Sequence, residues 1–354
     1  MGSPGTVPGP TSSTLRRNLS LDLSAAVGVG ITMALMGSLL PSVARLRLLA
    51  WPRWRPAAEG VRRIIRLMGP GIIGSSMSQV SLLLNSAIAT FLAVGSISAL
   101  YLADRLMEFP LGVFSIALGT VILPSLSAQH AKQAGAEFSA TLDWALRITV
   151  LLVAPAMIGM MFFSGPIVTA VFGFRKVSAT GMQMASWALI AYSWGVMTFS
   201  LVKVLAPGYY ARQDTRTPVR AAMIALAVNM GLNLCVVVPA VKLQFGAPYL
   251  LLATTTCISS AVNAVLLWRG LRRSGVYQPS RLWRGLLLRV AVACMAMAAL
   301  LWWMAASLDA WLAYHQLERL GRCLGAIALA ALLYFLVLYA LGVRRRDLQT
   351  RVAP

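Results

Sequence analysis

The chain has 354 residues, of which 58% are hydrophobic and only 12% are charged. Soluble domains carry roughly 25% charged residues, so this composition excludes a protein whose whole surface faces water. The formal net charge is +21, and a soluble protein with that charge would be a candidate for nucleic-acid binding. Here the basic residues lie in short loops between apolar segments, which indicates loops of a membrane protein and no nucleic-acid partner.

Residues 1–20 are rich in Gly, Pro, Ser and Thr, and we expect this segment to be disordered or a loop. Residues 21–354 are expected to form one transmembrane bundle. A bilayer core about 30 Å thick needs ~20 mostly apolar residues per helix. Such segments lie at 22–41, 68–93, 98–126, 141–163, 181–206, 219–239, 247–268, 285–306 and 320–342. The sequence therefore predicts an all-α, polytopic helical bundle with about nine spans.

The loops between these segments differ in charge. Basic residues concentrate in alternate connections, at 42–67, 127–140, 207–218, 269–284 and 343–354. The intervening loops and their flanks hold Arg175, Lys176, Lys242, Arg319 and Arg322. By the positive-inside rule the first set is cytoplasmic, so the C-terminus is predicted inside. Nine spans that end inside must begin outside, and we therefore expect a chain that lacks an N-terminal part.

Several predicted helices contain proline, at Gly69-Pro70-Gly71, Pro110, Pro124 and Pro155. Proline within a membrane helix frees a carbonyl and kinks the helix, which favours a transporter over a rigid anchor. The cysteines lie in apolar segments without CxxC spacing, so we expect them to pack as small apolar residues.

An unusual group of charges lies in the third segment, where Asp104, Arg105 and Glu108 fall within five positions. A charge at membrane depth is costly and usually faces a polar cavity or a partner. Arg105 and Glu108 lie three residues apart on one helix face, so one interpretation is a structural ion pair. The other is that Arg105 lines a water-filled cavity and binds an anion such as phosphate, which suits its planar guanidinium.

The run ADRLMEFPLGVFSIALGTVILPSLS at 103–127 resembles the signature of the MurJ/MviN lipid II flippases, which belong to the multidrug/oligosaccharidyl-lipid/polysaccharide exporter superfamily. Further similar blocks are Met68-Gly69-Pro70 with Ser78-Gln79 and Asn85, residues 188–193, and residues 203–218. The resemblance runs from about residue 22 to the C-terminus, so residues 1–20 are expected to be a non-family segment.

The resemblance implies a fold of fourteen helices in two lobes around a cavity, of which this chain would keep helices six to fourteen. It also implies a multi-pass protein of the bacterial inner membrane that moves lipid II from the inner to the outer leaflet by alternating access. The implied partners are lipid II, membrane lipids and a separate N-terminal lobe.

The resemblance assigns a pyrophosphate contact to Arg105, with Asp104 and Glu108 as weaker candidates that orient it. Some relatives bind sodium through carboxylates and amides. The corresponding positions here are Asn85, Asn229, Asn233 and Thr256, which include no carboxylate. Hydrogen-bonded helix packing is therefore favoured for these amides, with sodium or membrane-potential coupling as the alternative. No other cofactor, no metal and no catalytic residue is predicted.

Two further regions are predicted to contact lipid or the membrane surface. The resemblance implies a lipid-tail groove at roughly 285–342, and Trp302, Trp303 and Trp311 near its outer end are predicted to join an interfacial aromatic belt. Lys203 and the basic loop 212–216 are predicted at the cytoplasmic headgroups, where the loop either meets an anionic lipid or only fixes topology.

A drug–cation antiporter or polysaccharide-lipid exporter of the same superfamily is the nearest alternative to the flippase. A cation exporter would be expected to use buried carboxylates, whereas Asp104 and Glu108 here flank an arginine. A membrane-embedded enzyme is disfavoured because the loops are short and contain no HExxH motif or Gly-rich phosphate loop. A chain that is inactive without its first lobe is the remaining alternative.

Overall fold

The structure is a computed structural model that describes residues 79–80, 83, 85–88, 92, 95–173, 177–243, 246–280, 282–305, 310–311 and 314–343. These residues belong to one compact unit, Arg63–Pro354. The predicted segment 22–41 and most of 68–93 lie outside the described residues, as do Gly69-Pro70-Gly71 and residues 1–20.

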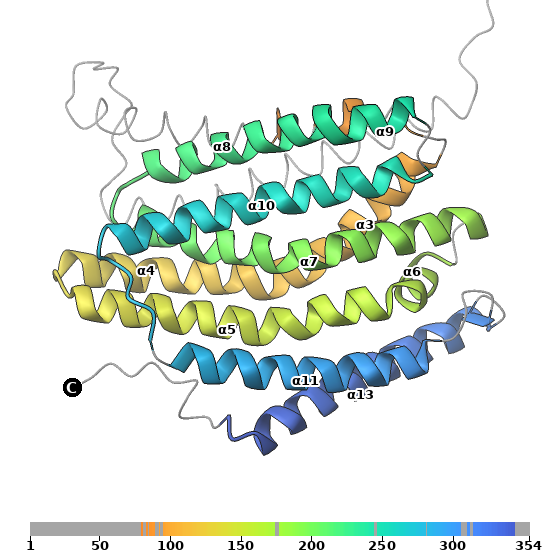
Figure 1. Ribbon diagram of the computed structural model, residues 1–354. Helices are drawn as coiled ribbons and strands as arrows, with labels where there is room; N and C mark the ends of the chain where they lie inside the picture. The colour runs from red at the N-terminus through yellow and green to blue at the C-terminus, as the bar shows by residue number, and fades with distance from the viewer. Residues whose placement is uncertain are drawn as a thin grey trace, which may run out of the picture. The chain divides into compact units, whose positions relative to one another are not determined.

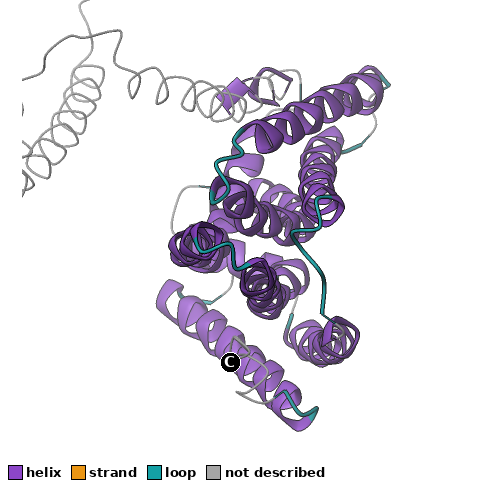
Figure 2. Cartoon of the chain, turned by 90° about the vertical axis from the view of Figure 1, so that its left-hand side faces the viewer, coloured by secondary structure: helices purple, strands orange, loops and turns teal. Residues whose placement is uncertain are grey.

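The part of the chain that the structure describes is helical and contains no strand (Figures 1 and 2). Its elements are α3 (Ser96–Pro110), the π-helical turn η1 (Leu111–Ile116), α4 (Ala117–Ala131), α5 (Gly135–Phe162), α6 (Ser164–Phe172), α7 (Ala179–Tyr210), α8 (Arg216–Leu232), the π-helical turn η2 (Asn233–Val237), α9 (Val238–Lys242), α10 (Pro248–Arg273), α11 (Leu282–Met304) and α13 (Gln316–Ala340).

Within these residues, 7 continuous helices are long and apolar enough to cross a membrane. They correspond to the seven predicted segments from 98–126 to 320–342, and this part of the all-α bundle prediction is confirmed. Most observed helices begin before the predicted start, as in the third segment, which runs over Ser96–Ala131, whereas Leu282–Met304 and Gln316–Ala340 end two residues before the predicted ends. The short helix α6, which directly follows α5, was not predicted, because its apolar residues continue those of the preceding span.

The prolines lie inside helices, as predicted, but their local effects differ. Pro124 and Pro155 lie within α4 and α5 without ending them. Pro110 is the last residue of α3, and the π-helical turn η1 follows it directly. Since proline has no N–H to donate, the helix hydrogen bonding is interrupted there, and a π-helical turn accommodates the interruption.

Helix α7 lies at the centre of the described bundle and packs against α3, α5 and α10. Its contact with α10 is close at Gly195, where an added Cβ would collide with the Cys257 thiol, and at Tyr209, whose ring lies against Gly270. Tyr209 also donates a hydrogen bond to the Leu267 carbonyl at 2.6 Å. Small residues therefore let these two helices approach, as is common inside membranes.

Helices α11 and α13 form a pair that packs against α5. The buried Tyr334 of α13 donates a hydrogen bond to the Leu151 carbonyl of α5 at 2.8 Å. Cys294 and Cys323 are buried around this contact and Cys257 is buried against α7, as predicted for packing residues, whereas Cys235 is exposed; all four are free thiols.

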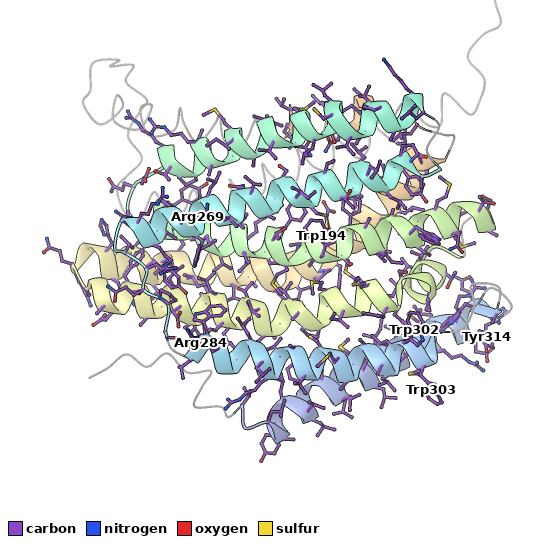
Figure 3. The ribbon with its side chains drawn as sticks, viewed as in Figure 1. Trp194, Arg269, Arg284, Trp302, Trp303 and Tyr314 are labelled. Atoms are coloured by element: carbon purple, nitrogen blue, oxygen red, sulfur yellow. The ribbon has the colours of Figure 1, made fainter. Side chains whose placement is uncertain are left out.

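The predicted aromatic belt needs one correction. Trp302 and Trp303 are 72% and 82% exposed at the end of α11, where a belt would lie (Figure 3). Trp311 is only 5% exposed and packs edge-to-face on Phe163 with ring centroids 5.5 Å apart. The prediction was wrong for Trp311 because Phe163 and Tyr314 both pack edge-to-face against its ring.

Candidate functional site

The guanidinium of Arg105 is held between residues from the turns before and after it on α3. Its Nη1 pairs with Glu108 Oε2 at 2.8 Å. Its Nε donates a hydrogen bond to the Tyr101 hydroxyl at 3.1 Å, and the guanidinium carbon lies 5.2 Å from the centre of the Tyr101 ring. The ion pair, one of the two interpretations of the sequence, therefore forms, and Tyr101 joins it through a contact that the four-residue spacing permits.

This ion pair is on the accessible side of α3. The side chains of Arg105 and Glu108 are 56% and 55% exposed. The buried positions of the same helix, Ala103 and Met107, face the bundle core. Exposed ion pairs of this kind contribute little to stability. The guanidinium of Arg105 is therefore accessible on this face of α3.

Asp104 lies apart from that accessible pair. Its carboxyl is partly buried and interacts electrostatically with Tyr192 of the central helix α7. Of the three charged residues in the motif, the structure brings Arg105 and Glu108 together and turns Asp104 toward the packed side.

The four polar residues predicted as a weak cation site lie together. Asn233 Nδ2 donates to Asn85 Oδ1 at 3.0 Å and to Asn229 Oδ1 at 3.2 Å. Asn85 Nδ2 lies 3.3 Å from Thr256 Oγ1. Thr255, which sequence reasoning missed, donates to Asn233 Oδ1 at 2.6 Å. We call these five residues the amide cluster.

The amide cluster is largely satisfied by its own hydrogen bonds. The oxygens that would coordinate a cation accept bonds from neighbouring amides and hydroxyls. No group of three or more His, Cys, Asp or Glu side chains that would hold a metal occurs among the described residues. Asn233 begins the π-helical turn η2, which widens α8 beside α10. The geometry favours hydrogen-bonded helix packing.

Sequence reasoning also missed Asp143, a carboxylate that is only 3% exposed near the start of α5. Its Oδ1 accepts hydrogen bonds from Trp283 Nε1 at 2.7 Å, Tyr277 at 3.0 Å and the Ser280 amide at 3.3 Å. Its Oδ2 pairs with Arg147 Nε at 3.0 Å. The available signal was an Asp–Arg pair four residues apart inside an apolar segment.

Asp143 attaches the connection between α10 and α11 to the start of α5. Burial, together with the Asp143 carboxylate beside it, raises the pKa of Tyr277 above its ordinary value. The hydroxyl therefore stays protonated and donates its hydrogen bond at neutral pH. A cavity of about 850 Å³ opens next to this contact, between the α4–α5 turn, Arg212 and the α10–α11 connection.

Three comparisons place the chain among known proteins. The family model described as "Lipid II flippase MurJ" matches residues 11–320, whereas the resemblance in the sequence was traced from about residue 22 to the C-terminus. The chain is 41% identical over 310 residues to a probable lipid II flippase MurJ of Vibrio cholerae, covering 88% of this chain and 58% of the relative. It is 39% identical over 342 residues to the Haemophilus influenzae protein of the same description, covering 93% and 64%.

A solved structure supports the fold. The chain matches the lipid II flippase MurJ in its inward closed conformation with a TM-score of 0.63 and 22% identity, covering 89% of this chain and 61% of that one. The chain thus spans about three fifths of the length of the relatives that it matches. At this identity the structural likeness establishes the fold.

Proposed function

Because the chain belongs to the lipid II flippase MurJ family, a family of transporters in the bacterial inner membrane, we propose that it takes part in moving lipid II from the inner to the outer leaflet. The observation that carries this proposal is the position of Arg105 within the family-like run at 103–127, with its guanidinium on the accessible side of α3.

In the proposed mechanism the guanidinium of Arg105 binds the pyrophosphate of the lipid. Its planar donors match phosphate oxygens, and the anion replaces the carboxylate of Glu108. Tyr101 keeps the Arg105 side chain extended through the hydroxyl contact at 3.1 Å. The prenyl tail stays in the bilayer, and a rocking motion of the helices exposes the headgroup on the other side.

The partner in this transport is proposed to include further helices that complete the cavity wall facing α3. Exposed side chains on this helix, including Tyr101 and Phe109 at 57% and 74%, offer a surface for them. A separate N-terminal lobe is the partner that we propose.

The binding step is tested on the full chain in nanodiscs with lipid II as the ligand. Arg322 offers a matched control, because it also pairs with a glutamate, Glu318 at 2.7 Å, and lies over a tyrosine ring. Arg105→Ala should weaken lipid II binding about tenfold or more, whereas Arg322→Ala should change it less than about twofold. Equal effects of the two substitutions would contradict a specific role for Arg105.

The transport step is tested in a strain depleted of its own flippase. The chain is expressed alone and together with the first five helices of a relative. The unchanged chain should support growth of this strain, and Arg105→Ala should not, when both are present at the same protein level. Growth with Arg105→Ala equal to growth with the unchanged chain would remove Arg105 from the mechanism.

A further inference from the structure

The cavity beside Asp143 is at the end of the bundle where three basic connections meet. It is lined by residues that include Gln129, His130, Ala136, Arg147, Arg212 and Ser280. These residues come from the end of α4, the start of α5, the α7–α8 connection and the α10–α11 connection. Residues far apart in the sequence thus enclose one cavity, with two arginines in its wall.

The electrostatic surroundings of the cavity are positive. Exposed arginines at the same end of the bundle include Arg269 and Arg284, which Figure 3 labels. Asp143 also lines the cavity, but its carboxylate accepts bonds from three donors and pairs with Arg147, so these two charges compensate each other and Arg212 carries the positive charge of the wall. His130 adds a ring nitrogen that can donate a hydrogen bond.

The N-terminus of α5 adds a second source of positive potential. Ala134, Gly135 and Ala136 line the cavity, and no side chain caps this 28-residue helix. The backbone N–H groups of an uncapped first turn attract anions, and phosphate is among the ligands bound at such a position. Glu137, the acidic residue of this turn, is exposed and is not among the residues that line the cavity.

The rim of the cavity is apolar where α11 begins. Leu282 lines it and is 51% exposed at the first position of a membrane-spanning helix. A ligand seated there would meet positive charge and helix N–H groups inside, and an apolar surface at the edge. This combination fits a molecule with an anionic phosphate and a hydrophobic part.

We propose that this cavity binds the phosphate of an anionic membrane phospholipid, with Arg212 and the first turn of α5 as the phosphate contacts. The site is separate from Arg105, and it does not depend on the proposed transport function. Basic pockets between membrane helices are suited to lipid headgroups of this charge. The positive surroundings select phosphatidylglycerol over phosphatidylcholine, because the choline ammonium would be repelled.

The test is native mass spectrometry of the full chain in detergent with added phosphatidylglycerol or phosphatidylcholine. Retention of phosphatidylglycerol should fall about five- to tenfold in Arg212→Gln, because a charge-assisted contact to phosphate is lost. Arg220→Gln is the control, since Arg220 is exposed on α8 but does not line the cavity. Equal losses of phosphatidylglycerol retention in the two variants would show that the lipid is held only by non-specific electrostatic attraction, and would overturn the proposal.

A second pair of variants separates binding from folding. Ala136→Asp places a carboxylate in the first turn of α5, which favours the helix but repels phosphate. It should keep or raise the melting temperature while lowering phosphatidylglycerol retention about fivefold, and Ala136→Ser should leave both unchanged. Unchanged retention in Ala136→Asp would exclude the helix N-terminus from the site.

Inorganic phosphate distinguishes a lipid site from a site for a soluble anion. Millimolar phosphate should not protect the chain from thermal unfolding, whereas phosphatidylglycerol should, in a manner that depends on Arg212. Arg212-dependent protection by phosphate alone, without retention of phosphatidylglycerol, would assign the cavity to a soluble anion and overturn the lipid proposal.

Discussion

The Arg105 guanidinium and the Glu108 carboxylate meet at 2.8 Å on a helix face where both side chains are more than half exposed. Under the function proposed above, the lipid pyrophosphate would replace the Glu108 carboxylate at this accessible arginine.

Tyr101→Phe should weaken binding of lipid II about two- to fourfold, because it removes the hydroxyl that accepts from Arg105 Nε but keeps the ring beneath the guanidinium. Tyr101→Leu, which removes both contacts, should weaken it further. Affinity in nanodiscs measures both changes, and Tyr314→Phe beside Arg322 is the matched control. An unchanged affinity for Tyr101→Leu would show that Tyr101 does not position Arg105.

Asn233→Leu should lower the free energy of unfolding by about 1–3 kcal/mol, because Asn85, Asn229 and Thr255 lose their shared partner. Asn263→Leu is the control, since no described residue forms a hydrogen bond with the buried Oδ1 of Asn263. Thermal unfolding in detergent measures both variants.

The same measurement separates helix packing from cation binding at the amide cluster. We propose a packing role, so replacing potassium by sodium at equal ionic strength should not shift the melting temperature. A stabilisation specific to sodium that disappears in Asn233→Leu would instead make the cluster a cation site.

The stability of the chain should fall above about pH 10 through Tyr277. The pKa of Tyr277 is higher in the folded chain than in the unfolded chain. Its full contribution to the stability of the folded chain is therefore present below the ordinary tyrosine pKa. As the pH rises further, the unfolded chain releases this proton and the folded chain does not, which favours unfolding. Melting temperatures measured against pH should decline less steeply in Tyr277→Phe, and parallel curves would argue against the contact with Asp143.

Gly270→Ala should destabilise the chain by about 1–3 kcal/mol, because the new methyl group collides with the Tyr209 hydroxyl that bonds Leu267. Gly321→Ala is the control, since no atom lies within 4 Å of its added Cβ, and it should change stability by less than about 1 kcal/mol.

The double variant Tyr209→Phe/Gly270→Ala removes the colliding hydroxyl. It should be more stable than the sum of the two single changes predicts. Additive losses would mean that the methyl group is accommodated elsewhere between α7 and α10.

Local sequence features were enough to predict the membrane class and the seven spans from 98–126 to 320–342, and they offered the pairing of Arg105 with Glu108 as one of two interpretations. Each depends on local information: apolar length for a span, and a three-residue separation on one helix turn for the pair. The family resemblance also grouped Asn85, Asn229, Asn233 and Thr256, which the structure brings into one cluster.

Contacts between residues that are far apart in the sequence became known only from the tertiary structure. The Asp143 carboxylate could be found as a charge in an apolar segment, but its donors Tyr277 and Trp283 lie more than a hundred residues further along the chain. Trp311 is a tryptophan near the end of a predicted span, as is typical of an aromatic belt, but it is buried because Phe163 packs on it. Such contacts cannot be predicted from separation in the sequence, since they arise when helices with compatible surfaces pack together. The exposure of Arg105 is likewise set by α7, which covers one side of α3 and leaves the charged side open.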